Sequence, residues 1–175
     1  MSTIAQVEKS IQQDQFYPVY LFHGEEPYYI DSLAASLEQN VLSKQEKSFN
    51  LSILYGKDVD AKAIMDHVGQ FPMMASYRLV IIREAQHMND MVKLASYVKD
   101  PLDSTILVIC YKYKKVDGRS AFYKALKNNK KAVIFESKRL YDNQVPTWIE
   151  NHVKSLGHGI GQNAIMQLAQ NVGTD

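Results

Sequence analysis

Short apolar runs alternate with stretches of helical periodicity along the first 135 residues of the chain. The apolar runs are rich in β-branched and aromatic residues, and two of them end at a glycine, which is typical of buried strands. The stretches between them place apolar residues three or four positions apart, which predicts amphipathic helices. The predicted strands are residues 18–23, 49–55, 78–82, 105–111 and 132–135. The predicted helices are residues 3–14, 27–42, 88–99 and 119–129, with another that follows Asp60 as its N-cap.

This alternation predicts the class of the fold. Strands followed by helices of this length are joined by right-handed crossovers and pair in parallel, with helices on both faces of the sheet. We therefore expect a three-layer α/β domain over residues 1–140, with a mostly parallel sheet of five strands. The chain is 46% hydrophobic and 22% charged, which is ordinary for a folded domain. No apolar run reaches the roughly 18 residues of a membrane span.

The pattern changes after the last predicted strand. A helical stretch surrounds Trp148, a glycine-rich step follows at residues 157–161, and a second helical stretch covers residues 164–172. Two such helices are too few to bury the apolar residues of the second one on both sides. We expect residues 141–175 to be the start of a small helical domain, and the chain to be a piece of a longer protein.

The first strand runs into Gly24, which prompts a search for a nucleotide site. A phosphate loop of the form G-x-x-x-x-G-K-[ST] needs free backbone N–H groups, a lysine and a hydroxyl group. Here the stretch from Gly24 to Asp31 reads GEEPYYID, in which only the first glycine fits. Glu25 and Glu26 would repel phosphate, and Pro27 lacks an N–H group. The sequence predicts a degenerate phosphate loop at Gly24, Glu25 and Glu26, with no nucleotide cofactor.

Other catalytic signals are also weak. After the strand at 78–82 the chain has Arg83 and Glu84 where an ATPase would place two acids to hold magnesium, and we expect these side chains to form ion pairs instead. The five histidines lack metal-ligand spacing, and the single Cys110 lies in an apolar run, so no metal site is predicted. We expect a non-catalytic, cytoplasmic protein without a signal peptide. A domain of this type that still hydrolyses nucleotide is an alternative.

Positive charge is concentrated in one segment. The net charge is +1, yet residues 112–139 hold ten Lys or Arg against two Asp or Glu. Basic residues interleaved with tyrosines suit a phosphate backbone or an acidic partner, which makes residues 111–131 a candidate contact surface. A solvated helix face with flexible lysines is the alternative. The candidate contact residues are Lys112, Lys114, Lys115, Arg119 and Lys124.

The first strand and its loop also resemble a known family. Residues 18–30, PVYLFHGEEPYYI, resemble PVYLLxGEEPYLI, the common opening of bacterial DNA polymerase III delta subunits, which are clamp-loader subunits. Further similar blocks follow in the same order, up to the stretch 164–175. The resemblance implies an AAA+-like fold that has lost its nucleotide machinery, followed by a small helical lid. It also implies that the chain comprises the N-terminal domains, with the lid truncated and the C-terminal collar domain absent.

A function and a site follow from the same resemblance. In the family, delta binds and opens the beta sliding clamp for loading onto primed DNA, in a complex with the gamma or tau and delta prime subunits. Its clamp-binding element precedes an Ala-Ser pair, and the pair Ala75-Ser76 aligns that element with Phe71, Met73 and Met74. The family commonly has Leu-Phe where this chain has two methionines, which can also fill an apolar pocket. Packing in the core is the alternative for these residues, and a stand-alone DNA-binding module using residues 111–131 is the alternative function.

Overall fold

Five strands form one parallel sheet in the computed structural model, which describes residues 2–172. The chain divides into two compact units, Met1–Ser137 and Lys138–Asp175, and the sheet lies in the first. The strand order is β2-β3-β4-β1-β5, and each neighbouring pair runs parallel. The predicted parallel five-stranded sheet is therefore confirmed. The strands are β1 (Val19–Gly24), β2 (Leu51–Tyr55), β3 (Arg78–Arg83), β4 (Thr105–Lys112) and β5 (Ala132–Ser137).

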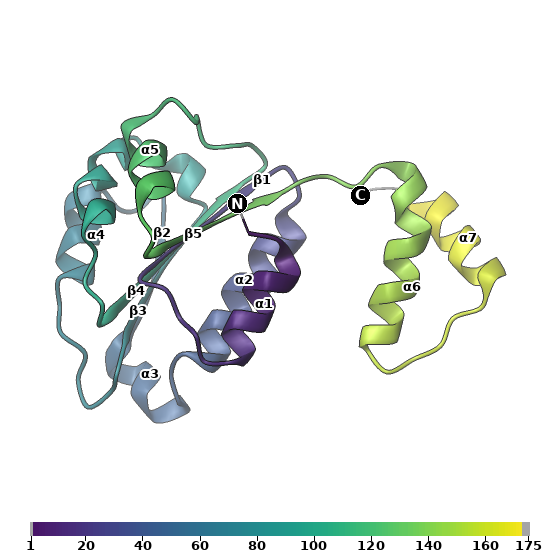
Figure 1. Cartoon of the computed structure of the whole chain (residues 1–175), viewed down its shortest axis with the longest axis horizontal. Coiled ribbons are helices and arrows are strands. Elements are labelled where there is room, and N and C mark those ends of the chain that lie inside the picture. Colours follow the sequence, from purple (N-terminus) through teal and green to yellow (C-terminus); the bar gives the residue numbers. More distant parts are fainter. Residues whose placement is uncertain (1, 173–175) are drawn as a thin grey trace. The chain divides into compact units, whose positions relative to one another are not determined.

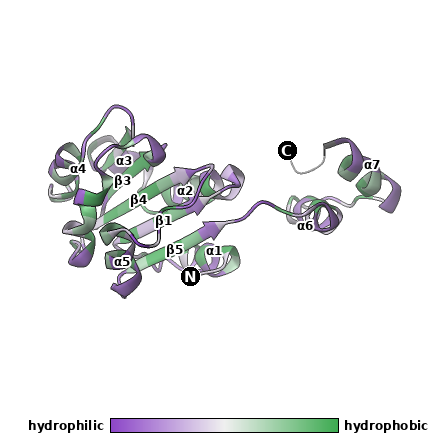
Figure 2. Cartoon of the chain, turned by 90° about the horizontal axis from the view of Figure 1, so that it is seen from above, coloured by the Kyte–Doolittle hydropathy of each residue, from purple (hydrophilic) through white to green (hydrophobic). Residues whose placement is uncertain are grey.

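Helices cover both faces of this sheet (Figure 1). On one face, α1 (Ile4–Gln12) and α2 (Pro27–Asn40) pack against alternate residues of the strands. On the other face lie α4 (Ala61–Val68) and α5 (Ala121–Asn128), with three short 3-10 helices. The strands are predominantly hydrophobic, and hydrophilic positions lie on the outer helices and loops (Figure 2). The 3-10 helices are η1 (Ala85–His87), η2 (Met91–Ala95) and η3 (Tyr97–Lys99).

Two elements differ from the prediction. The predicted helix at 88–99 consists of η2 and η3, which still bury Leu94 and Val98 against the sheet. The predicted strand at 49–55 begins later, because α3 (Lys44–Asn50) occupies its first two positions. A capping box starts α3: the Ser43 hydroxyl accepts from the Glu46 N–H, and the Glu46 carboxylate accepts from the Ser43 N–H.

The second unit contains a helix pair. The pair is α6 (Val145–Ser155) and α7 (Gln162–Val172), and the short 3-10 helix η4 (Asp142–Gln144) precedes it. Among the described residues of this unit, Val145, Ile149 and Ile165 are buried, whereas Met166 and Leu168 are 45% and 42% exposed. None of the helices in the part of the chain that the structure describes is long and apolar enough to cross a membrane.

Candidate functional site

The carboxyl ends of β1 and β4 meet at a topological switch point. These strands are neighbours, with Gly24 opposite Lys112, but the chain leaves β1 toward α2 on one face and β4 toward α5 on the other. In parallel α/β sheets, ligands bind in the crevice at such a point. The phosphate-loop position, residues 24–31, and the start of the basic segment therefore meet where a nucleotide would be expected.

Backbone from β5 closes the phosphate loop. The N–H group of Glu25 donates to the Ser137 carbonyl at 2.9 Å, so a donor that would hold phosphate is used within the protein. Gly24 has φ +142° and lies so close to β5 that an added Cβ would be 1.9 Å from the Ser137 carbonyl oxygen. A glycine is required here because the β5 backbone occupies the space beside the loop.

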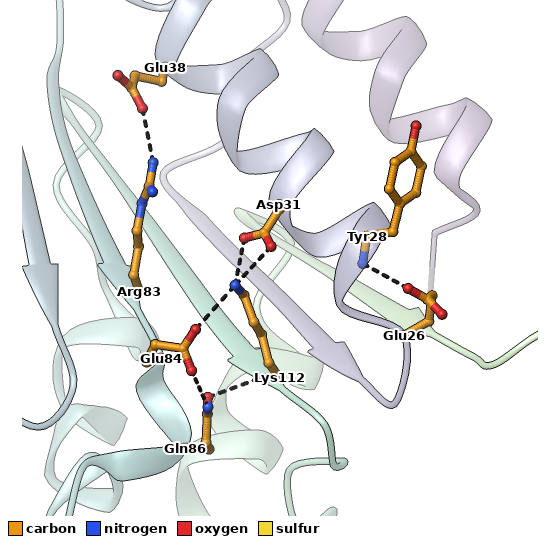
Figure 3. Close-up of polar contacts among 8 residues, drawn as sticks. All are labelled: Glu26, Tyr28, Asp31, Glu38, Arg83, Glu84, Gln86 and Lys112. Atoms are coloured by element: carbon orange, nitrogen blue, oxygen red, sulfur yellow. Dashed lines mark hydrogen bonds and ion pairs between the residues drawn. The ribbon is translucent and has the colours of Figure 1, made fainter. Parts of the chain in front are cut away.

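A carboxylate from the chain itself caps the first turn of α2. The Glu26 side chain accepts from the backbone N–H of Tyr28 at 2.9 Å (Figure 3). The N-terminus of a helix attracts anions because its N–H groups are unpaired and its dipole is positive there. Glu26 thus places a fixed negative charge where a phosphate group would approach.

The ammonium group of Lys112 lies between two carboxylates, in what we call the Lys112 network (Figure 3). Its Nζ is 2.7 Å from Asp31 of α2 and 3.2 Å from Glu84, which follows β3. Gln86 completes the network: its amide donates to the second Glu84 oxygen, and its Oε1 accepts from the Lys112 backbone N–H at 3.0 Å. The Lys112 ammonium group at the end of β4 therefore neutralises the carboxylates of Asp31 and Glu84.

Burial and pairing act in opposite directions on these groups. Desolvation raises the pKa of Glu84, but the hydrogen bonds from Lys112 and Gln86 and the Lys112 charge outweigh it, and the net pKa is lowered. Desolvation lowers the pKa of Lys112, but its bonds to Asp31 and Glu84 outweigh this, and the net pKa is raised. Both shifts favour the charged forms, so the network is an ion-pair cluster at neutral pH.

Arg83 forms an ion pair of its own beside this network. Its guanidinium lies 3.4 Å from the carboxylate of Glu38 in α2 (Figure 3). Arg83 and Glu84, the residues at the magnesium-binding position of an ATPase, are thus both engaged in ion pairs, as the sequence predicted. Within residues 2–172, no three His, Cys, Asp or Glu side chains are grouped to hold a metal ion.

A second feature is the loop of residues 69–77 between α4 and β3, which we call the apolar loop. Phe71 is 79% exposed, Met73 58% and Met74 101%, so none of the three predicted site residues is packed in the core. Met74 also has φ +52°, a left-handed conformation that costs a non-glycine residue about 1 kcal/mol or more. The structure places three large apolar side chains on one exposed loop, and core packing, the alternative for them, is excluded.

Four of the five predicted contact residues of the basic segment lie on the surface. Lys114, Lys115, Arg119 and Lys124 are exposed, and Lys114 lies 5.7 Å from the centre of the Tyr111 ring. Lys115 is 2.7 Å from Glu136, and Arg119 is 3.2 Å from Asp117. Lys112 is different, because it is 8% exposed and belongs to the ion-pair network. Of the five predicted contact residues, Lys112 therefore does not lie on the exposed basic surface.

The sheet order, the switch point and the occupied phosphate loop define the class: an AAA+-like α/β domain whose phosphate-loop position is filled by its own groups. Within that class, the family model described as "DNA polymerase III, delta subunit" matches residues 20–138. The chain belongs to the DNA polymerase III delta subunit family. The resemblance that begins at residues 18–30 is confirmed.

Individual proteins agree with the family match. DNA polymerase III subunit delta of Bacillus subtilis (strain 168) is 31% identical over 173 residues, which cover 93% of this chain and 49% of that protein. The clamp loader delta protein of Bacillus subtilis has a similar structure, with a TM-score of 0.76 and 25% identity over 97% of this chain and 58% of that one. The chain thus spans about half the length of these relatives.

A more distant structure shares the fold alone. A protein of Thermotoga maritima related to the DNA polymerase III gamma subunit has a TM-score of 0.51 at 13% identity. The match covers 89% of this chain and 53% of that protein. The three-layer α/β fold that the sequence predicted is therefore shared with this protein as well as with the clamp loader delta protein.

Proposed function

We propose that this chain binds the beta sliding clamp through Phe71, Met73 and Met74 of the apolar loop, as part of a clamp loader. The observation that carries the proposal is the exposure of these three side chains, from 58% for Met73 to 101% for Met74, in a member of the delta family. Burying a Phe or Met side chain contributes about 1.5–3 kcal/mol. Three such side chains at one tip are the kind of compact apolar anchor that dominates protein interfaces.

Clamp opening follows from binding if the loop fits the open ring better than the closed one. A ligand shifts a conformational equilibrium only by its difference in affinity for the two states. The chain needs no chemical step for this role, and it acts in the cytoplasm as a non-catalytic subunit. ATP is hydrolysed by other subunits of the loader, which include gamma or tau. Delta prime belongs to the same complex, and the clamp is loaded onto primed DNA.

The contacts at the phosphate-loop position support the proposal that this subunit does not bind ATP. The Ser137 carbonyl takes a loop donor, Glu26 caps the helix N-terminus, and Lys112 lies between Asp31 and Glu84. ATP and magnesium would have to displace all of these groups and bring phosphates next to fixed carboxylates. We propose further that residues 141–175 belong to the helical lid domain.

The exposed basic surface offers a second contact within the loader. Lys114, Lys115, Arg119 and Lys124 lie near the end of β4 and the start of α5, and positive side chains so placed suit the backbone of primed DNA or an acidic subunit. A stand-alone DNA-binding module remains the alternative function, and it predicts DNA binding without any clamp binding.

Binding of a purified bacterial beta sliding clamp tests the proposal. We expect the wild-type chain to bind, and Phe71→Ala and Met74→Ala each to weaken binding by tenfold or more, because each removes an anchor of about 2 kcal/mol. Met166→Ala is the matched control, since Met166 is also exposed but lies in α7. A clamp that binds wild type and both loop variants equally well would refute the site assignment.

A further inference from the structure

The apolar loop requires contacts with the rest of the domain to keep a defined conformation. Apolar side chains exposed to water contribute no free energy that would hold the loop in one conformation. A loop without other restraints would lose conformational entropy when it binds a partner. The loop nevertheless has a defined form, with Met74 in a left-handed conformation at its tip. Such a conformation persists only where the surroundings determine it.

Asn50, at the end of α3, supplies the central restraint. Its side chain is completely buried, and its Oδ1 accepts from the Met73 N–H at 2.7 Å. Its Nδ2 donates to the Met73 carbonyl at 2.9 Å and to the Glu46 carbonyl at 3.0 Å. Both backbone polar groups of Met73 are thus paired with a single amide, 23 residues away in the sequence. A primary amide can donate and accept in this way, whereas a carboxylate or an alkyl group cannot.

Arg78 restrains the neighbouring backbone. Its buried guanidinium donates to the His67 carbonyl at 2.9 Å, at the end of α4, and to the Phe49 carbonyl at 3.2 Å, in α3. The side chain therefore joins the two helix ends between which the apolar loop is held. With Met73 fixed by Asn50 and the chain entering β3 at Arg78, the tip between them is confined from both sides.

We infer that Asn50 is a positioning residue, which holds the apolar loop in its binding form before the partner arrives. The inference rests on the proposed function and deepens it, because it assigns part of the clamp affinity to a residue that does not contact the clamp. Pre-ordering the loop removes an entropic cost that would otherwise reduce affinity. Asn50→Ala leaves Phe71, Met73 and Met74 unchanged, and it removes both bonds to the Met73 backbone together with the bond to the Glu46 carbonyl within α3.

The chain contains a matched control. Asn129 uses its amide in the same way, because its Oδ1 accepts from the Lys131 N–H at 2.8 Å and its Nδ2 donates to the Val98 carbonyl at 2.7 Å. The Nδ2 bond joins the end of α5 to η3, the Oδ1 bond is local, and both lie outside the apolar loop. Asn129→Ala therefore removes comparable hydrogen bonds without releasing Met73.

Two measurements on the chain test the inference. Amide hydrogen exchange of Met73 in the free chain should be at least tenfold faster in Asn50→Ala and unchanged in Asn129→Ala. The affinity for the sliding clamp should fall about tenfold in Asn50→Ala, and Asn129→Ala should bind like wild type. Unchanged exchange in Asn50→Ala would overturn the inference. Faster exchange with unchanged affinity would also overturn it, because the ordering would then contribute nothing to binding.

Two further measurements separate a loss of folding or of clamp binding from a loss of loop restraint. Circular dichroism shows whether Asn50→Ala folds. Where it does not, Asn50→Asp keeps the shape and the acceptor for the Met73 N–H but loses the donor to the Met73 carbonyl, and wild-type clamp affinity in that variant would overturn the inference. A wild-type chain that does not bind the clamp at all would refute the proposed function. The exchange of Met73 would still decide whether Asn50 holds the loop.

Discussion

Replacing Lys112 with methionine tests whether the ion-pair network joins the carboxyl ends of β3 and β4 to α2. The substitution nearly keeps the length of the side chain and removes its charge. Asp31 and Glu84 would then face each other without the cation that lies 2.7 Å and 3.2 Å from them. The domain loses two attractive contacts and gains a repulsion between like charges.

The size of the effect follows from how much water each group keeps. Removing one partner of a fully buried pair costs about 3–5 kcal/mol. The Lys112 side chain is 10% exposed, but those of Asp31 and Glu84 are 53% and 30% exposed. Because both carboxylates keep part of their hydration, we expect the free energy of unfolding of the first unit to fall by about 1–3 kcal/mol.

Urea unfolding at pH 7, followed by far-ultraviolet circular dichroism, measures this loss. The single tryptophan, Trp148, lies in the second unit, so its fluorescence would not report on the network. A loss of 2 kcal/mol lowers the urea midpoint by about 1 M. Lys131→Met is the control: Lys131 pairs with Asp103 at 2.8 Å on the surface, where an ion pair contributes little.

A combined variant separates charge from packing. Adding Asp31→Asn and Glu84→Gln to Lys112→Met removes the uncompensated carboxylates, and we expect most of the lost stability to return. If Lys112→Met is as stable as wild type, or if the triple variant is no more stable than the single one, the network does not hold these elements together by charge.

Three further predictions follow from the same structure. Because the folded pKa of Glu84 is lowered, its stabilising contribution is complete above the unfolded value of about 4.3 and is lost as the pH falls through the folded value. The difference in urea stability between wild type and Glu84→Gln should therefore shrink below about pH 4, and a difference that grows there contradicts the shift. Gly24→Ala should lower the free energy of unfolding by roughly 2 kcal/mol or more, since its Cβ has no room beside Ser137; a thermal midpoint equal to that of wild type contradicts the close approach. Arg119→Ala and Lys124→Ala should leave clamp affinity unchanged and each lower the salt slope of DNA binding by about 1; unchanged slopes would remove this surface from the DNA contact.

The sequence predicts the fold well because the sheet is buried on both faces. Runs such as residues 78–82 and 105–111 have no polar alternation, and the chain between them is too long for hairpins, so parallel pairing was the consistent solution. Asp60 caps α4 as predicted, with its carboxylate accepting from the Ala63 N–H. The missed helix α3 also carried a local signal, since Ser43 and Glu46 have capping-box spacing.

The site was only partly predictable, because its main contacts join residues far apart in the chain. Lys112 looked like one more exposed lysine of a basic segment, and only the sheet register places it between carboxylates 28 and 81 positions earlier. Asn50 gave no local signal beyond a polar residue between Phe49 and Leu51. Its partner Met73 is recognised only once α3 and the apolar loop are placed in space. The exposure of the apolar loop is consistent with Pro72 and Ser76, because both are turn residues.

In the proposed function, the domain's own groups occupy its phosphate site and its apolar loop binds a protein instead. Calorimetric titration of the sliding clamp with the chain, in the presence and absence of magnesium and ATP, tests both parts at once. We predict saturable binding whose affinity and heat are the same under the two conditions, and no heat when ATP is titrated into the chain alone. Saturable, magnesium-dependent ATP binding, or clamp binding that requires ATP, would contradict the account.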